Sequence, residues 1–470
     1  MIYENGKTGD IRIAYIGGGS RGWAWKFMTD LAIEPSMSGT IILYDIDQEA
    51  AKANEIIGNK VNARSDSVGK WNYIVADSLK AALTGCDFVV ISILPGTFDE
   101  MESDVHLPER LGIYQSVGDT AGPGGMIRAL RTLPMFVEIG EAIREYAPNA
   151  WVVNYTNPMS LCIQILYDVF PGIKAFGCCH EVFGTQRVLA DICSLKLGIK
   201  DIQRREIIVN VQGINHFTWF SEAFYQGIDL FPIYEEFIDG HYEEGFDDPD
   251  RNWANSTFCC AHRVKFDLFR RYGMIAAAGD RHLAEFMPGN EYLKDPGTVA
   301  KWKFALTSVK WRKEDLEHRL EKSRRLLNGE EEVELNPTGE EGILLIKALC
   351  GLERVVSNVN IPNTGMQIGN LPAEAVVETN AIFERDTIRP ILAGNLPEHV
   401  KELIMSAVEN HETILEAALT CNEELVVKAF MNDPQVKGRK CEEQDIRLLV
   451  KDMLSATKKY LPEPALWSCP

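Results

Sequence analysis

Two cysteines, a histidine and a glutamate stand side by side in the stretch GCCHEVFG, residues 177–184. The stretch closes an apolar run, IKAFG, whose composition is typical of a buried strand. Cys179 could bind a metal ion as a thiolate, and His180 beside it could transfer a proton. The alternative is a buried cysteine with a purely structural role. The stretch by itself leaves both interpretations open.

Histidine and carboxylate side chains recur in two later stretches. In GINHFTW, His216 has strongly apolar, strand-like surroundings, where it is either a metal ligand or a satisfied histidine of the core. In AAAGDRHLAEF, four polar side chains lie close together: Asp280, Arg281, His282 and Glu285. Asp280 could serve in proton transfer, or it could be only the N-cap of a helix that starts at Arg281.

Two asparagines follow a predicted strand in AWVVNYTNP. The amides of Asn154 and Asn157 could orient a ribose or a sugar hydroxyl. They could also form no more than a turn before Pro158.

The elements that must position these side chains alternate between strand and helix over the first 160 residues or so. Strand patterns recur as TIILYDID, NYIVAD, CDFVVISIL and AWVVNYTNP, with helical stretches between them. This alternation predicts a doubly wound parallel sheet in an α/β fold. Because ligands bind beyond the carboxyl ends of such strands, the candidate site segments are LPGT at 94–97, NYTNP at 154–158 and GCCHE.

A glycine loop follows the first of these strands in IRIAYIGGGSRG, where residues 11–16 are the predicted strand. The loop matches the dinucleotide fingerprint and contributes Gly17, Gly19, Ser20 and Gly22. Asp45 ends the next strand a little over 20 residues later, where a carboxylate can accept hydrogen bonds from the ribose of NAD. The same carboxylate would repel a 2′-phosphate, so the pattern favours NAD over NADP. An ordinary tight turn is the alternative.

The length of 470 residues, 46% of them hydrophobic, is enough for two domains. We place the boundary near residue 195, with a Rossmann-like domain over 8–195 and a second domain over 196–470. The second half contains a predicted strand pair around EIIVNVQGINHFTWFSEAFYQG and a long charged helix from about Lys301 to Leu327.

The charge balance narrows the classes of partner. Lysine and arginine number 48 against 68 aspartate and glutamate, a net charge of −20, which disfavours nucleic acid and anionic membrane surfaces. A small-molecule partner is expected, and the lack of a basic helix-turn-helix segment argues against an NAD-sensing regulator. The eleven cysteines form no C-x-x-C pair, and no leader or membrane-length apolar run is evident. We expect a cytoplasmic protein with reduced thiols.

Taken together, the motifs resemble glycoside hydrolase family 4, the NAD- and metal-dependent glycosidases. From about residue 10 to residue 400 the chain contains, in order, IGGGSRG, LYDID, GPGG with RALRTLP, NYTNPM, CCHEV, GINHFTW, GDRHLAEF and GNLPAEAVVE. The resemblance implies a Rossmann domain joined to an α+β C-terminal domain like that of lactate and malate dehydrogenases. It also implies a homodimer or homotetramer.

The resemblance further implies an unusual hydrolysis. NAD⁺ takes hydride from C3 of the sugar, a base removes the acidified C2 proton, and the C1 leaving group departs. Water then adds, and NADH returns the hydride. A divalent metal, usually Mn²⁺, would stabilise the negative charge that develops on the sugar oxygens.

Carried onto this sequence, the resemblance implies roles for specific residues. Cys179 and His216 would bind the metal, and His180 would be the acid for the leaving group. Asp280 would be the C2 base, although several phospho-sugar members use a tyrosine. Asn154 would contact sugar hydroxyls. The remaining asparagine of that motif, Asn157, would reach cofactor or substrate.

The tetrapeptide at the metal cysteine bears on the substrate. Phospho-sugar members carry Asp or Asn after the cysteine and proline in the fourth position, whereas this chain reads Cys-His-Glu-Val. This form most resembles the α-galacturonidase branch, with α-galactosidase or α-glucuronidase as alternatives. Glu181 would contact the C4 hydroxyl or orient His180, and Arg281 or another basic residue would bind a uronate carboxylate. An NAD-dependent hydroxy-acid or sugar dehydrogenase would share the fingerprint but need no metal at Cys179 and His216.

Overall fold

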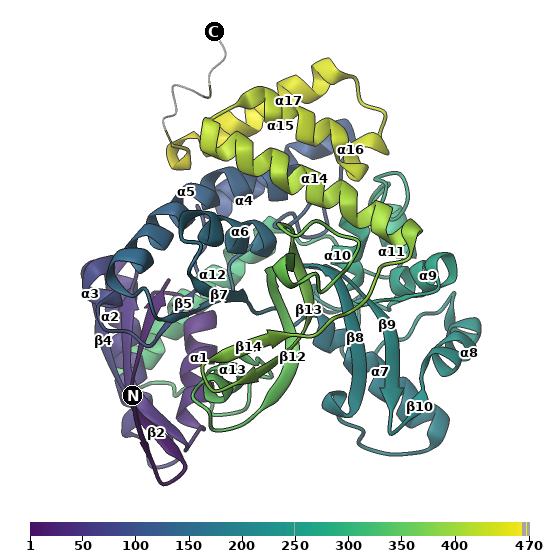
Figure 1. The fold of residues 1–470 in the computed structure, drawn as a ribbon. Helices are drawn as coiled ribbons and strands as arrows, with labels where there is room; N and C mark the ends of the chain where they lie inside the picture. The colour runs from purple at the N-terminus through teal and green to yellow at the C-terminus, as the bar shows by residue number, and fades with distance from the viewer. Residues whose placement is uncertain (249, 463–466, 468–470) are drawn as a thin grey trace.

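The computed structural model describes residues 1–248, 250–462 and 467. Six parallel strands form the centre of a large sheet in the order β4-β3-β2-β5-β6-β7 (Figure 1). Their bounds are β2 Lys7–Ile16, β3 Met37–Tyr44, β4 Lys70–Val75, β5 Phe88–Ile91, β6 Trp151–Asn154 and β7 Lys174–Gly177. This order reverses direction at β2 and β5, as in dinucleotide-binding folds. The predicted doubly wound α/β sheet is confirmed.

The apolar run of β2 explains why this strand lies at the centre. Ala14 and Ile16 pack into one hydrophobic core, while Ile11, Ile13 and Tyr15 pack into another on the opposite face of the sheet. A strand covered on both faces has no polar side, so it reads as a continuous apolar stretch. The helices that cover the faces are α1 Trp23–Ala32, α2 Gln48–Ala63, α3 Leu79–Leu83, α5 Gly122–Tyr146 and α6 Met159–Val169. Helix α4 Phe98–His106 packs on α5, and α7 Glu181–Leu197 packs in a separate core with residues of the second half of the chain.

The second half of the chain extends the same sheet. Beyond β7 come three antiparallel strands, β12 Val355–Pro362, β13 Val376–Glu384 and β14 Thr387–Pro390. At the other end of the chain, β1 Ile2–Glu4 forms a hairpin with β2. The two predicted domains, 8–195 and 196–470, therefore share one sheet, and the boundary between them stays a prediction.

A smaller antiparallel sheet carries the GINHFTW motif. It consists of β8 Ile207–Ile214, β9 Phe217–Tyr225, β10 Ile228–Asp229 and β11 Ile275–Ala276. The predicted strand pair is thus confirmed as β8 and β9. His216 is not inside a strand, however: it lies in the tight turn between β8 and β9 with a positive φ of 64°.

Helices surround the smaller sheet and cap the molecule (Figure 1). Their bounds are α8 Phe231–His241, α9 Arg263–Tyr272, α10 Asp280–Glu285, α11 Pro296–Lys301, α12 Val309–Asn328, α13 Gly342–Leu349, α14 Glu398–Thr420, α15 Glu423–Asn432, α16 Pro434–Lys437 and α17 Glu443–Thr457. Short 3-10 turns occur at Pro108–Leu111, Arg204–Glu206, Asn363–Gly365 and Lys458–Tyr460. None of the helices in the described residues is both long and apolar enough to cross a bilayer.

The long charged helix begins later than the sequence predicts. Lys301 ends α11, and α12 starts only at Val309. The Ser308 side chain accepts a hydrogen bond from the amide of Trp311, which caps the new helix. A helix start at Lys301 is therefore wrong, because a cap seven residues later sets the boundary.

Candidate active site

The glycine loop between β2 and α1 is tightly packed against its surroundings. Gly17 has a φ of 94°, and a Cβ added there would overlap the carbonyl oxygen of Ser92. A Cβ on Gly19 would come within 2.7 Å of the Ala50 Cβ and 2.9 Å of the Asp45 Oδ2. Such close backbone approach leaves the amides at the start of α1 open to an anion, as a pyrophosphate site requires.

Polar contacts hold this loop in shape. Ser20 Oγ accepts a hydrogen bond from the Trp23 amide at 3.2 Å, at the start of α1. Asp45 accepts from the Gly19 amide at 2.9 Å with Oδ2, and burial raises the pKa of this carboxyl. All five predicted cofactor positions of this region, Gly17, Gly19, Ser20, Gly22 and Asp45, therefore lie together. The arrangement fits a dinucleotide.

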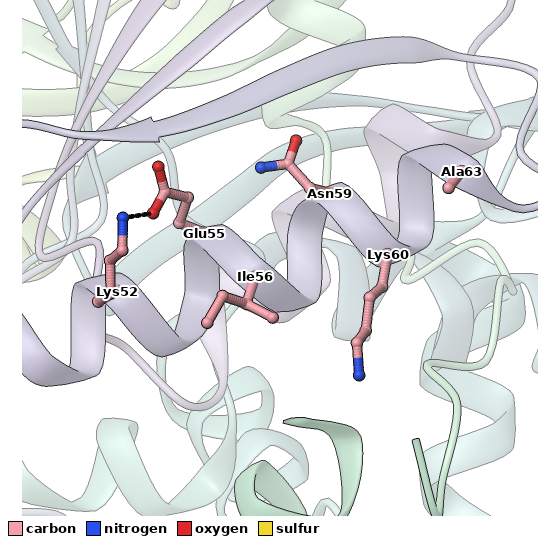
Figure 2. Close-up of a pocket in the computed structure, with 6 residues that line it drawn as sticks. All are labelled: Lys52, Glu55, Ile56, Asn59, Lys60 and Ala63. Carbon is pink, nitrogen blue, oxygen red and sulfur yellow. Dashed lines mark ion pairs between the residues drawn. The ribbon is translucent and has the colours of Figure 1, made fainter. Parts of the chain in front are cut away.

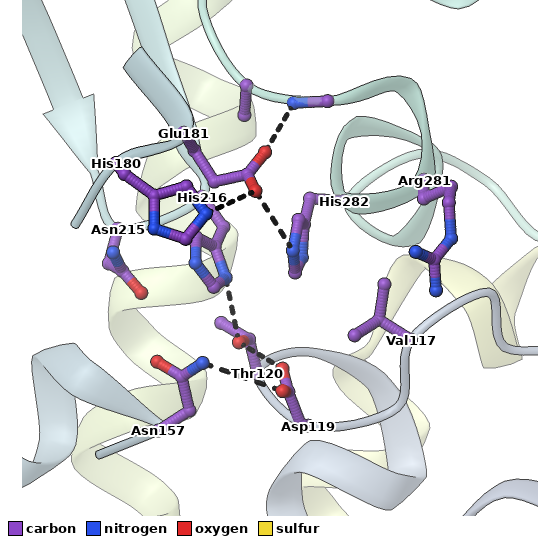
Figure 3. Close-up of polar contacts among 12 residues, drawn as sticks. Val117, Asp119, Thr120, Asn157, His180, Glu181, Asn215, His216, Arg281 and His282 are labelled. Atoms are coloured by element: carbon purple, nitrogen blue, oxygen red, sulfur yellow. Dashed lines mark hydrogen bonds and ion pairs between the residues drawn. The ribbon is translucent and has the colours of Figure 1, made fainter. Parts of the chain in front are cut away.

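A chain of side chains connects α5 to the β8–β9 turn (Figure 3). Thr120 Oγ1 donates to Asp119 Oδ1 at 2.8 Å and lies 2.9 Å from His216 Nδ1. Because the hydroxyl proton goes to the carboxylate, the hydroxyl oxygen must accept from His216 Nδ1–H. This assignment leaves the other ring nitrogen, Nε2, with a free lone pair. A histidine that binds a metal is held in this way.

His282 lies against His216, with ring centroids 3.8 Å apart. Candidate ligand atoms of Asp119, His216 and His282 all lie within 4.8 Å of one another. Burial and His282 lower the pKa of His216 to about 3, and burial lowers the pKa of His282. Despite burial, Arg128, His282 and His216 hold the pKa of Asp119 below its usual range. Two neutral imidazoles beside an ionised carboxylate suit a divalent cation.

Cys179 follows β7 and is buried, 7% exposed. Burial raises the pKa of its thiol well above the usual range, Glu378 and Glu181 add to this, and the Asn215 side chain opposes it by hydrogen bonding. Asn215 is the neighbour of His216 in the β8–β9 turn, so the turn brings the cysteine and the histidine into one region. A bound cation would supply the positive charge that a thiolate needs here. The donor group that the structure gathers within 4.8 Å, Asp119, His216 and His282, fits a metal, and Cys179 does not belong to that group among the described residues.

Glu181 links three elements at this site (Figure 3). Its Oε2 accepts from the Gly279 amide at 2.8 Å, and its Oε1 lies 3.9 Å from Nε2 of both His180 and His282. Although burial opposes it, His282, His180 and His216 lower the pKa of Glu181 to about 2. Glu181 therefore lies within ion-pair distance of both histidines.

His180 lies at the outer side of this group. Its side chain is 48% exposed, and Nδ1 lies 3.3 Å from Glu340 Oε2. Burial opposes protonation, but hydrogen bonding to Glu340 and the charges of Glu181 and Glu340 together outweigh it and raise the pKa of His180. A partly exposed histidine between two carboxylates can act as an acid.

The two predicted asparagines differ in their freedom. Asn154 is fully buried, and both ends of its amide bond to the backbone of Thr156, at 2.9 and 3.0 Å. Asn157 Nδ2 lies 3.5 Å from Asp119 Oδ2, and its buried Oδ1 has no hydrogen-bond partner in the described structure. Asn157 is thus available to a ligand, whereas Asn154 shapes the turn that carries it.

Asp280 lies in a different cluster. It is fully buried, and its two oxygens accept from the amides of Val264 and Lys265, at 3.1 and 3.2 Å. Its neighbours are Cys260 and His262. The aspartate does not cap a helix starting at Arg281, since α10 begins at Asp280 itself; it caps α9 instead. The structure does not bring it to the His216 cluster.

Asp119 and Thr120 are not identified from the sequence as candidate site residues. Ala121 separates them from the GPGG motif at the start of α5, a motif that served only to indicate the resemblance. The signal that could have identified them is a carboxylate and a hydroxyl side chain close to a glycine-rich helix start. Glu285 holds this loop in place, accepting from the amides of Val117 and Gly118 at 2.7 and 2.9 Å.

A surface hollow of about 480 Å³ lies elsewhere, along α2 (Figure 2). It is lined by Lys52, Glu55, Ile56, Asn59, Lys60 and Ala63. An ion pair joins Lys52 to Glu55, and Lys60 Nζ binds the Leu326 carbonyl at the end of α12. None of the predicted site residues lines this hollow, so we assign it no chemistry.

A nucleotide-binding type of fold and a cluster of histidine and carboxylate side chains define a class: an enzyme with a dinucleotide cradle and a metal-type site. The family 4 glycosyl hydrolase model matches residues 12–195, and the model of the family 4 glycosyl hydrolase C-terminal domain matches residues 211–436. This chain belongs to glycosyl hydrolase family 4, and it is a glycoside hydrolase.

Individual relatives agree with this placement. An alpha-galacturonidase of Lachnoclostridium phytofermentans is 69% identical over 463 residues, covering 98% of this chain and 99% of that protein. An alpha-galacturonidase of Bacillus subtilis is 53% identical over 444 residues, covering 94% and 97%. A crystal structure of lplD from Bacillus subtilis, described as a glucosidase, has a TM-score of 0.90 and 52% identity over 95% of this chain and all of that chain.

A more distant solved structure shares the fold. It is a 6-phospho-alpha-glucosidase from gut microorganisms in complex with NAD and Mn²⁺, with a TM-score of 0.79 and 20% identity over 97% of this chain and 99% of that chain.

Proposed function

We propose that this enzyme hydrolyses α-galacturonides with NAD and a divalent metal, Mn²⁺, as cofactors. The substrate assignment is supported by 53–69% identity to four alpha-galacturonidases over 94–98% of the chain. An alpha-galactosidase of Bacillus subtilis is only 28% identical over a similar length. The sugar is therefore a uronide of the galacto series.

The residues of the glycine loop would hold the dinucleotide. Gly17, Gly19 and Gly22 would let its pyrophosphate approach the start of α1, and Asp45 would bind the ribose hydroxyls. Asn157, with its unpartnered Oδ1, would contact the cofactor or the sugar.

The metal would be held by Cys179 and His216, with the Thr120 hydroxyl fixing the ring of His216. When bound, NAD supplies the hydride acceptor and donor for C3, and the metal supplies a Lewis acid for the sugar oxygens. Asp119 lies where it could complete the ligand set.

The proton at C2 requires a base, and two neighbouring residues compete for the role. The oxygens of Asp280 are used by the amides of α9. His282 lies against His216, and its buried Nδ1 has no hydrogen-bond partner in the described structure. We therefore assign the C2 base to His282 and a structural role to Asp280.

His180 would protonate the leaving-group oxygen at C1. It is partly exposed, as a group at the mouth of a site must be if the aglycone is to leave. Glu181 would keep His180 and His282 in position from one carboxylate.

The test is release of aryl alcohol from an aryl α-galacturonide, with the α-glucuronide and α-galactoside alongside. Each is measured with and without NAD⁺, Mn²⁺ and reductant. We expect the galacturonide to be cleaved in strong preference to the other two glycosides, with turnover abolished by chelator or by omission of NAD⁺ and with no net NADH. Preference for another of the sugars would overturn the proposed substrate specificity. Accumulation of NADH without bond cleavage would indicate a dehydrogenase.

Assembly as a homodimer or homotetramer, and a location in the cytoplasm, belong to the same proposal. Light scattering of the purified protein measures the assembly directly.

A further inference from the structure

A uronate carries a carboxylate at C6, and its binding site needs a cation. The residue predicted for this role is Arg281, but its guanidinium is already used in contacts within the protein. Its Nη2 donates to the Ser116 carbonyl at 2.8 Å and its Nε to the Ala305 carbonyl at 3.2 Å, and its guanidinium lies over the Phe258 ring at 5.3 Å. Arg281 therefore has little capacity left for a ligand.

The start of α12 is fastened to the loop that carries Asp119. The amide and the hydroxyl of Thr307 both donate to the Ser116 carbonyl, at 3.1 and 2.8 Å. This is the same oxygen that Arg281 binds, three residues before Asp119. The first turn of α12 thus has a fixed position beside the cluster.

Arg312 lies in that first turn, and its side chain is unpaired. Its Nε is buried without a hydrogen-bond partner, and no ion pair to it occurs among the described residues. Neighbouring basic side chains of the helix are paired: Lys313 with Asp99 at 2.7 Å and Arg319 with Asp315 at 2.6 Å. An unpaired, partly buried guanidinium is costly unless an anion binds it.

The electrostatic surroundings of Arg312 are those of the active site. Burial lowers the pKa of its guanidinium, the charge of Asp119 opposes this, and Arg281 adds to it. Arg128 also lies beside Asp119, but its Nε donates to the Asn157 carbonyl at 3.1 Å, and it is the main positive charge on Asp119. Arg312 is the one of these three arginines whose side chain makes no hydrogen bond in the described structure.

We propose that Arg312 binds the C6 carboxylate of the substrate and so determines the specificity for uronides. This inference rests on the proposed function. A planar guanidinium can pair with a carboxylate through two parallel hydrogen bonds, which a neutral C6 hydroxymethyl group cannot accept.

The cofactor pyrophosphate is a second anion that an arginine of α12 could bind. A second arginine of α12, Arg319, contacts the position that a Cβ on Gly22 would occupy, so it lies at the glycine loop. Arg312 precedes it by seven residues, about 10 Å along a helix. The helix therefore presents one arginine to the cofactor loop and another to the cluster at Asp119.

The experiment compares Arg312→Gln and Arg312→Lys with the wild-type enzyme on aryl α-galacturonide and aryl α-galactoside. We expect Arg312→Gln to lower kcat/KM for the galacturonide by about 100-fold, as loss of a charge-assisted pair does, and to leave the galactoside rate within about twofold. Arg312→Lys should retain part of the galacturonide rate. Lys310→Gln, the same charge change on an exposed side chain of α12, should have no effect.

Binding measurements separate the possible failures. We expect calorimetry to show D-galacturonate binding that Arg312→Gln weakens and NAD⁺ binding that it does not. Equal loss on both sugars, or weakened NAD⁺ binding, would overturn the proposal in favour of a structural or cofactor role. If the wild-type enzyme cleaves no galacturonide yet binds galacturonate through Arg312, the proposed function fails and this inference stands.

Discussion

The Thr120 hydroxyl is expected to control metal binding although it would not touch the metal. Replacement by valine keeps the shape of the side chain but removes the hydrogen bonds to Asp119 and His216, at 2.8 and 2.9 Å. His216 Nδ1–H then has no acceptor in a buried place, and the tautomer with a free Nε2 loses its support. Removing such a partner typically costs 10- to 100-fold in metal affinity.

The assay is a Mn²⁺ titration of Thr120→Val, followed by electron paramagnetic resonance of free Mn²⁺ and by activity at saturating NAD⁺. Both readouts should move together by about 10- to 100-fold, and unfolding should become easier by about 1–3 kcal/mol. Thr120→Ser keeps the hydroxyl and should behave as the wild-type enzyme does. Wild-type Mn²⁺ affinity in Thr120→Val would refute the relay from Asp119 to His216.

Three further predictions follow from the packing. Asp280→Asn should destabilise the fold by about 1–3 kcal/mol and leave kcat within several-fold, whereas His282→Asn should abolish exchange of the C2 proton with deuterated water. Gly17→Ala should lose NAD⁺ binding in calorimetry, because its Cβ would overlap the Ser92 carbonyl. Burial raises the pKa of Asp433 from 3.8 to about 7, so its contribution to stability is full below pH 4 and is lost as pH rises to 7. Asp433→Asn should therefore gain up to about 4 kcal/mol on the wild type between these values in urea unfolding.

The strands of the parallel sheet could be predicted because their burial on both faces leaves an unmistakable apolar run. The cofactor loop could be predicted for a similar reason, since Gly17 and Gly19 answer to steric demands of neighbouring backbone and side chains. In both cases the signal lies within one short segment.

The hydrogen-bond partners of Asp280 could not be predicted from the residues that surround it in the sequence. Its partners are the amides of Val264 and Lys265, 16 and 15 residues earlier, and the direction of its side chain depends on how α9 packs against α10. The late start of α12 has a comparable cause, since Ser308 competes with the helical pattern before it. The role of Asp119 depends on Thr120, which donates to it and also contacts His216 in the β8–β9 turn, 96 residues further along the chain.

The strand that leads to Cys179, β7, acquires its second pairing partner very late in synthesis. β7 pairs on one side with β6 and on the other with β12, where Gly177 lies opposite Asn360, 183 residues further along the chain (360 − 177 = 183). While the ribosome makes the intervening segment, β7 is an exposed edge of an unfinished sheet. The nascent chain must therefore keep that edge from pairing with other chains until residues 355–362 emerge, a period of about 10–40 s at ordinary elongation rates. Expression yield should accordingly respond to chaperones that bind unpaired strands early in translation.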